Sequence, residues 1–221
     1  MRTEVSTPLE GRRLLVAVSG SIAAVKTPLL VSALVKAGAE VRCLVTPSAA
    51  KLVSPLALAT LSRHRCYTED DGWDASCSRP LHIELAEWVE LVLLAPLSAT
   101  SLSRWSQGSA DGLLASVLLA CECPVLAAIA MNTAMWSHPA VQRNWQVVQT
   151  FPGVVPLMPQ PGLLACDRLG DGRMADPMLI ELAASSLFSR GDTGPVANRD
   201  WSGRRLPVSY THLRAHETKP N

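Results

Sequence analysis

The sequence lacks an excess of charge of either sign. Its 221 residues include 20 Lys and Arg against 19 Asp and Glu, a formal net charge of +1. A near-neutral chain has no electrostatic footprint for a nucleic acid or an anionic membrane, so neither partner is expected. Lysines number only four, and none lies in a context that favours a Schiff base, which disfavours pyridoxal phosphate chemistry.

Long hydrophobic runs and metal-type cysteine spacings are also missing. The longest apolar runs are too short to span a bilayer, and residues 1–11 lack the basic and apolar regions of a secretory leader. The six cysteines follow neither a disulfide framework nor the C-x-x-C spacing of a zinc site. We therefore expect a cytoplasmic protein without a metal site, in which Cys43, Cys121 and Cys123 are small buried hydrophobic residues.

Apolar runs alternate with segments of helical spacing along the chain, which is 48% hydrophobic. Buried strands are predicted at 12–20, 39–46, 89–96, 123–130 and 153–157. Helices are predicted at 21–38, 80–88, 98–108, 110–120, 139–150 and 176–188, with Pro28 kinking or restarting the first of them and Gly38 ending it. Strands alternating with helices predict an α/β fold, a three-layer α/β/α sandwich around a flavodoxin- or Rossmann-like parallel sheet.

Composition divides the chain into one large domain and an extension. A short N-terminal segment, 1–10, precedes the domain at 11–190. Residues 191–209 begin as a Gly/Pro/Asp linker and continue as the turn-and-strand start of a second, truncated α/β unit. Residues 210–221 are polar without apolar periodicity and are expected to be disordered.

Three of the predicted strands end in turns that carry hydroxyl groups. These turns are "SGSIAA" (19–24), "TPSAA" (46–50) and "PLSATS" (96–101). Each could be an ordinary tight turn, and none is the G-x-G-x-x-G of a dinucleotide site. Carboxyl ends of parallel strands meet at one sheet edge, so the three turns together predict a single phosphorylated ligand. The residues concerned are Gly20, Ser21, Thr46, Ser48, Ser98, Thr100 and Ser101.

Three further features call for a chemical explanation. "AMNTAMW" (130–136) follows the fourth strand, where a plain turn would use Gly, Ser or Asp. His82 precedes the third strand; it is either a surface or core histidine or a group that acts as a base or orients a carboxylate. Cys166 lies among glycines and aspartates in a predicted flexible loop, where a thiol is either incidental or reactive.

Four segments, in order, resemble the homo-oligomeric flavin-containing cysteine decarboxylase family over about residues 11–190. They are "VSGSIAAVKTP", "LHIELAEWVELVLLAP", "AMNTAMW" and "ACDRLGDGRMADP". The resemblance implies FMN as cofactor and decarboxylation of 4′-phosphopantothenoyl-L-cysteine to 4′-phosphopantetheine in coenzyme A biosynthesis. It also implies a homotrimer, or a multiple of trimers, with FMN and substrate at subunit contacts. "SGRRLPVS" (202–209) resembles the opening of the synthetase domain of bifunctional members.

The resemblance also implies roles for individual residues. Asn132 would bind the substrate carboxylate through its amide N–H groups, while the methionines and Trp136 pack the segment around it. His82 would be a base or carboxylate partner, and Cys166 would donate a proton after CO2 loss. FMN would supply the electron sink that an unactivated cysteine carboxyl lacks. The implied FMN site is Gly20, Ser21, Ile22, Thr46, Ser48, Ser98, Ala99, Thr100, Ser101 and Ala130, and the implied substrate site is Met131, Asn132, Ala165 and Cys166.

Three positions depart from the family's usual pattern, and other activities of the same fold stay open. Thr100 and Gly112 stand where Asn is common, and Ile129 stands where Pro is common. Thr100 can still donate to a phosphate, whereas Ile129 is expected to relax the turn that carries Asn132. The alternatives are a peptidyl-cysteine oxidative decarboxylase, a flavin prenyltransferase and a non-catalytic flavin-binding protein partner.

Overall fold

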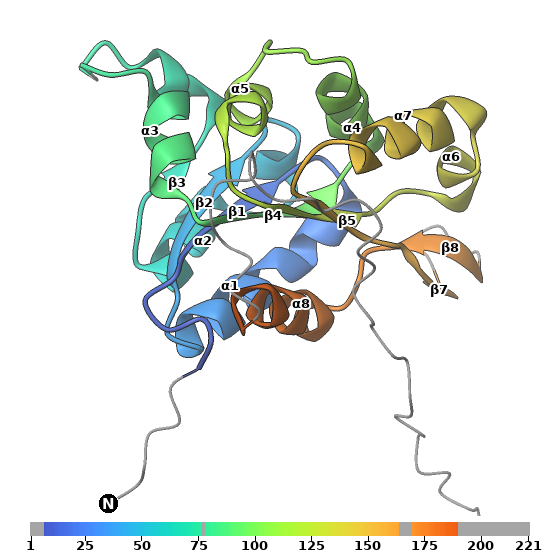
Figure 1. Ribbon diagram of the computed structural model, residues 1–221, viewed down its shortest axis with the longest axis horizontal. Coiled ribbons are helices and arrows are strands. Elements are labelled where there is room, and N and C mark those ends of the chain that lie inside the picture. Colours follow the sequence, from blue (N-terminus) through green and yellow to red (C-terminus); the bar gives the residue numbers. More distant parts are fainter. Residues whose placement is uncertain (1–6, 77, 164–168, 190–221) are drawn as a thin grey trace, which may run out of the picture.

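Six strands form one parallel sheet, covered by helices on both faces (Figure 1). The computed structural model describes residues 7–76, 78–163 and 169–189. The expectations for residues 1–6, for Ala165 and Cys166, and for the linker and tail beyond 190 lie outside the described residues. The predicted three-layer α/β/α arrangement is confirmed.

The strand order in the sheet is β3-β2-β1-β4-β5-β6. The chain first adds β2 and β3 on one side of β1 and then adds β4, β5 and β6 on the other, so the switch point of the sheet lies between β1 and β4. Open α/β sheets bind their ligands at such a switch point. Every residue of β4 is buried, which explains its uninterrupted apolar run, because a central parallel strand is covered on both sides. The strands are β1 (Arg13–Val18), β2 (Glu40–Val45), β3 (Cys66–Tyr67), β4 (Leu91–Leu97), β5 (Val125–Ile129) and β6 (Val154–Leu157).

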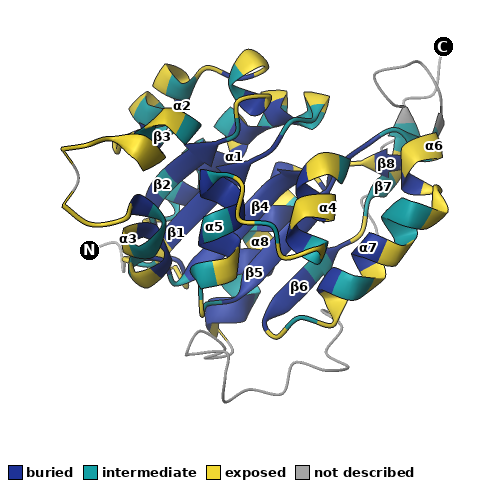
Figure 2. Cartoon of the chain, turned by 90° about the horizontal axis from the view of Figure 1, so that it is seen from above, coloured by how far each residue is buried: buried dark blue, intermediate teal, exposed yellow. Residues whose placement is uncertain are grey.

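Alternate strand residues point to opposite faces and build two hydrophobic clusters. Val16 and Leu93 face α1 (Thr27–Lys36), α2 (Pro55–Ser62) and α8 (Pro177–Ser189). Leu15 and Leu94 face the other layer. That layer consists of α3 (Leu81–Trp88), α4 (Ala99–Ser106), α5 (Leu113–Ala120) and α7 (Pro139–Gln149). Figure 2 shows the buried strands between these two layers.

The helix predicted at 21–38 is two elements. A 3-10 helix, η1 (Ile22–Lys26), comes first, and α1 restarts with Pro28 in its first turn, where a missing N–H costs nothing. Gly38 follows α1 at φ +86°, a backbone conformation that glycine adopts readily, so the predicted end is confirmed.

Several elements were not predicted from the sequence. They are α2, β3, η2 (Ala49–Lys51), η3 (Glu69–Trp73), α6 (Thr133–Trp136) and an antiparallel pair, β7 (Gln160–Leu163) with β8 (Leu169–Arg173). The pair corrects the prediction of a loop for residues 162–163 and 169–173, which are paired strands, whereas Cys166 itself lies outside the described residues. Their glycines suggested a loop, but they are needed for close packing, as described below.

The cysteine prediction is partly confirmed. Cys43 is fully buried in β2, and burial raises the pKa of its thiol, so it is a packing residue. Cys121 and Cys123 are half-buried instead, because they lie in the connection between α5 and β5. In the part of the chain that the structure describes, no helix combines the length and the hydropathy that a membrane span requires.

Candidate active site

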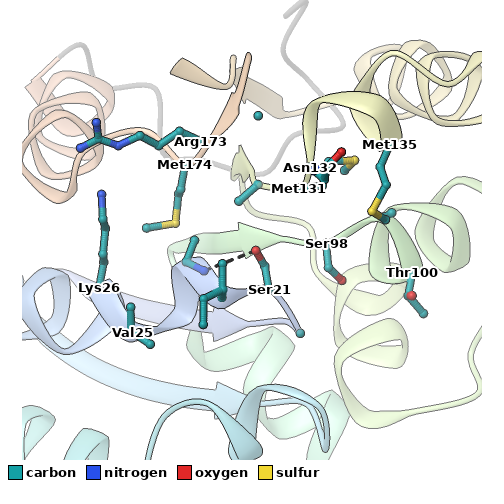
Figure 3. A pocket seen from close by; sticks show the side chains of 16 residues that line it. Ser21, Val25, Lys26, Ser98, Thr100, Met131, Asn132, Met135, Arg173 and Met174 are labelled. Atoms are coloured by element: carbon teal, nitrogen blue, oxygen red, sulfur yellow. Dashed lines mark hydrogen bonds between the residues drawn. The ribbon is translucent and has the colours of Figure 1, made fainter. Parts of the chain in front are cut away.

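A pocket of about 640 Å³ opens at the carboxyl ends of β1, β4 and β5, next to the switch point (Figure 3). Such a volume lies within the range of small-molecule and cofactor sites. The pocket unites segments from Gly20 to Met174, 154 residues apart in the sequence, because the strand ends of the parallel sheet meet there and the end of β8 joins them. The predicted residues that line it are Gly20, Ser21, Ile22, Ser98, Ala99, Thr100, Ala130, Met131 and Asn132.

Ser19 joins the ends of β1 and β4. Its hydroxyl donates to the carbonyl of Pro96 at 2.8 Å and accepts from the backbone N–H of Ser98 at 2.7 Å. The side chain is fully buried, so both bonds are shielded from water. Sequence reasoning gave Ser19 no role of its own; the available signal was a hydroxyl at the last position of an apolar run. Ser19 thereby sets the spacing of the two turns that line the pocket.

Gly20 brings a third turn to the same edge. A Cβ built at Gly20 would lie 2.5 Å from Cβ of Ser48, so the turn after β1 presses on the turn after β2 and tolerates no side chain. Thr46 hydrogen-bonds by its N–H to Val18 at 3.0 Å, and its Oγ1 accepts from Ala49 N–H at 3.3 Å. Thr46 and Ser48 therefore support the pocket edge without lining it. Their direct contact with a cofactor stays a prediction.

The serines at the pocket cap short helices. Ser21 Oγ accepts from the N–H of Ala23 at 3.4 Å, and Ser98 Oγ accepts from the N–H of Ser101 at 3.4 Å. Ser101 is buried behind Ser98 and does not line the pocket. Thr100 is exposed at the rim, where its hydroxyl can meet a ligand. This hydroxyl-rich end can receive a phosphate.

The turn that carries Asn132 is held by β8. Met131 N–H donates to the carbonyl of Gly172 at 2.9 Å, and a Cβ at Gly172 would lie 2.2 Å from Met131 O. A Cβ at Gly170 would lie 2.5 Å from Thr133 Oγ1. Glycine at both positions lets the β7–β8 pair pack directly onto the turn. The glycine-rich segment is therefore a wall of the site.

Asn132 itself is the N-cap of α6. Its Oδ1 accepts from the N–H of Ala134 at 2.8 Å, which orients the amide. Met131 and Trp136 are buried, and Trp136 packs edge-to-face on Trp145 with ring centroids 6.0 Å apart. The predicted packing role is confirmed for these two residues. Met135 differs: it is 48% exposed and lines the pocket, because α6 turns it away from the core.

His82 lies elsewhere in the chain. It is half-buried on α3 and lines a second pocket, of about 570 Å³, with Glu69, Trp73 and Arg79. His82 and Asn132 therefore line different pockets within one chain. Ala165 and Cys166 belong to the residues that the structure does not describe.

Six pocket residues had no predicted role: Ala23, Val25, Lys26, Gly172, Arg173 and Met174. Lys26, Arg173 and Met174 line the pocket from η1 and from the end of β8. All three lie inside segments that resemble the family, and this position in the sequence was the only indication that they belong to the site. Met174 is almost fully buried. With Ile22, Val25 and Ala130 it forms an apolar stretch of wall that suits a flat aromatic ring system such as an isoalloxazine.

Comparisons with known proteins agree with this geometry. A family model described as Flavoprotein matches residues 2–183. The coenzyme A biosynthesis bifunctional protein CoaBC of Bacillus subtilis is 39% identical over 191 residues, 86% of this chain and 47% of that protein. A probable phosphopantothenoylcysteine decarboxylase of Streptococcus mutans is 39% identical over 171 residues, 75% of this chain and 92% of that protein. The chain thus spans about half the length of the CoaBC protein it matches.

Solved structures show the same fold. A cysteine-to-serine mutant of PPC decarboxylase complexed with pantothenoylaminoethenethiol superposes with a TM-score of 0.76 at 33% identity, over 81% of this chain and 100% of that one. The FMN binding protein AtHal3 gives a TM-score of 0.74 at 33% identity, over 82% of this chain and 98% of that one. The resemblance predicted from the four segments is confirmed.

Proposed function

The chain belongs to the flavoprotein family, and from that premise we propose that it is an FMN-dependent decarboxylase acting on 4′-phosphopantothenoyl-L-cysteine. The product would be 4′-phosphopantetheine, an intermediate of coenzyme A biosynthesis. One observation carries the proposal: a single pocket unites two of the hydroxyl-bearing turns, those after β1 and β4, with the Asn132 segment. The names of the relatives, CoaBC and probable phosphopantothenoylcysteine decarboxylase, support it.

The pocket has the parts that FMN would need. The backbone N–H of Gly20, with the hydroxyls of Ser21, Ser98 and Thr100, would hold the phosphate. The apolar wall around Met174 would keep water away from the ring. When bound, FMN would supply the electron sink for loss of CO2. The Gly20 turn, which a Cβ would close against Ser48, is the cradle that fits this cofactor.

The substrate carboxylate would meet Asn132. Because Oδ1 of Asn132 accepts from Ala134 N–H, the amide N–H groups are the side of this residue that a carboxylate would approach. A neutral amide orients the carboxylate and leaves it ionised, so that CO2 can depart as a neutral molecule while the electron pair of the broken bond stays with the substrate. The hairpin glycines keep this amide in position.

We also propose that the site is completed in a homotrimer. His82 lines a different pocket from Asn132 within one chain, so it would reach the substrate from a neighbouring copy. Ile22, Val25 and Leu29 are 54%, 54% and 67% exposed on η1 and α1, beside the first pocket. Apolar side chains exposed next to a site favour burial against another subunit. His82 would then act as base or carboxylate partner, and Cys166 as proton donor.

The test is a flavin spectrum of the purified protein, followed by mass spectrometry of its product. We expect a yellow protein that releases CO2 from 4′-phosphopantothenoyl-L-cysteine and forms 4′-phosphopantetheine. Accumulation of an ene-thiol would instead indicate an oxidative peptidyl-cysteine decarboxylase. A colourless protein, or a yellow one that releases no CO2 from either kind of substrate, would overturn the decarboxylase assignment.

A further inference from the structure

Two cationic side chains line one side of the pocket. Lys26 ends η1 and is half-buried, and Arg173 ends β8. In Figure 3 their side chains point toward one another, on the side of the pocket opposite Ser98 and Thr100. The pocket therefore has two polar ends, one of hydroxyls and backbone N–H groups and one of positive charge.

Among the described residues, neither cation is paired with an acid. The ion pairs of the described residues involve Arg12, Arg13, Arg42, His64, Arg65, Arg79 and Arg104, but neither Lys26 nor Arg173. A cationic pair at the wall of a largely apolar pocket, with no carboxylate partner among the described residues, attracts an anion. Guanidinium binds phosphate through two parallel hydrogen bonds, and an ammonium adds a point charge. The chemistry of this end therefore suits a phosphate.

Gly162 makes room for the guanidinium. A Cβ at Gly162 would lie 3.3 Å from Nη1 and 3.5 Å from Cδ of Arg173, which crosses from β8 over β7. Arg173 thus lies against the hairpin backbone, and its position depends on the small residue beneath it. Arg173 is an exposed residue, so an anion that enters the pocket can reach its guanidinium.

We propose that Lys26 and Arg173 bind the 4′-phosphate of the substrate and make the enzyme prefer the phosphorylated substrate. The inference rests on the proposed function, which brings two phosphate-bearing molecules to one pocket. The Gly20–Ser21 end takes the phosphate of the cofactor, and Asn132 takes the substrate carboxylate. The cationic end is then the place left for the second phosphate, at the far end of an extended substrate.

The test compares variants with phosphorylated and unphosphorylated ligands. Lys26→Gln and Arg173→Gln are assayed with 4′-phosphopantothenoylcysteine and with pantothenoylcysteine. Each variant is expected to lose about 10- to 100-fold in kcat/KM for the phosphorylated substrate, the value of a charged hydrogen bond, and little for the other. Lys36 is an exposed lysine at the end of α1, outside the pocket. Lys36→Gln is therefore the matched control and should leave kcat/KM unchanged for both substrates.

A second measurement does not depend on turnover. Calorimetry compares binding of 4′-phosphopantothenate, which lacks the reacting cysteine, with binding of pantothenate. The wild type should prefer the phosphorylated ligand, and the variants should lose that preference while absorbance at 450 nm shows unchanged flavin content. Equal losses for both ligands, or loss of flavin in the variants, would overturn the inference even if decarboxylation is confirmed. An inactive wild type that still shows the preference would overturn the proposed activity and leave the phosphate site standing.

Discussion

At the scale of single residues, the pocket depends on polar groups whose bonds are already committed to the fold. The hydroxyl of Ser19 hydrogen-bonds to Pro96 and Ser98 and so links the ends of β1 and β4, and Ser98 caps α4. Asn132 caps α6 with the oxygen of its amide. Groups positioned in this way need not reorganise when a ligand arrives, which is what makes a site effective.

Asn132→Asp tests the carboxylate contact. Asp also caps helices, so α6 should persist and flavin should stay bound. A negative charge against the substrate carboxylate in a desolvated site should lower kcat/KM by about 100-fold or more. Steady-state kinetics with a flavin spectrum measure both quantities. Gln107→Glu, which adds the same charge on the exposed end of α4, should remain active. Normal turnover by Asn132→Asp would mean that this residue does not touch the carboxylate.

At the scale of elements, the β7–β8 pair determines where the Asn132 turn lies. Gly170 and Gly172 lie in β8 at distances that no Cβ could occupy. At α5, another element replaces a missing helix cap. The N-cap residue of α5 is Gly112, which has no side chain to accept a hydrogen bond. Glu69 from η3 accepts from the N–H of Leu113 at 2.9 Å, and a Cβ at Gly112 would lie 3.1 Å from that carboxylate. The departure from the family pattern at Gly112 is thus accommodated by a carboxylate that caps the helix from another element.

Gly172→Ala should damage the site through the backbone. The new Cβ would meet Met131 O at 2.2 Å, at a φ of +149° that side chains rarely adopt, so β8 must move off the turn. We expect a loss of roughly 2 kcal/mol in unfolding free energy, from strain and lost contacts, and at least a tenfold loss of activity. Chemical denaturation and kinetics measure the two effects.

Gly108→Ala is the control for backbone strain alone. Gly108 also has a positive φ, +69°, but a Cβ there meets nothing within 4 Å. Gly108→Ala should lower the unfolding free energy by about 1 kcal/mol and leave activity unchanged. Equal effects of the two substitutions would show that the contact with Met131 is unimportant.

At the scale of the whole molecule, acid should weaken the fold through Glu90. Burial opposes ionisation of this carboxyl, but Arg13 N–H at 2.9 Å and the guanidinium groups of Arg12 and Arg13 outweigh it and hold its pKa below 4.5. A lowered pKa means that the contribution is complete above pH 4.5 and is lost as the pH falls through the folded-state pKa.

Glu90→Gln should therefore lower the unfolding free energy by roughly 1 kcal/mol at pH 7. The difference in unfolding free energy between this variant and the wild type should shrink below pH 4. Urea denaturation between pH 3 and pH 7 measures this trend. Glu122→Gln, at an exposed carboxylate, is the matched control for removal of a surface charge. A constant difference at all pH values would contradict the assigned role of the Glu90 charge.

The proposed trimer predicts that inactive variants complement one another. If His82 and Asn132 of different copies form each site, co-expressed His82→Asn and Asn132→Asp chains should recover about one quarter of wild-type activity, because a quarter of randomly paired contacts carry both native residues. Each variant alone should be inactive. Light scattering should give a trimer or a multiple of it. No recovery in verified mixed oligomers would mean that both residues act within one chain.

Local patterns in the sequence were sufficient for the layered α/β fold and for the edge of the sheet that carries the site. The apolar runs of β1, β2, β4 and β5 and their hydroxyl-bearing ends are features of short continuous segments. The rules of parallel sheets then place these ends together. The four recognised segments were also sufficient for the family.

The tertiary structure alone decided which side chains meet. Ser19 contacts Ser98 from 79 residues away, β8 packs on the Asn132 turn, and Lys26 and Arg173 reach one pocket. It also separated His82 from Asn132 within the chain. Such contacts depend on distances between segments remote in sequence, which no local periodicity encodes. A glycine that permits a close approach also looks, in the sequence, like a glycine that permits a loop.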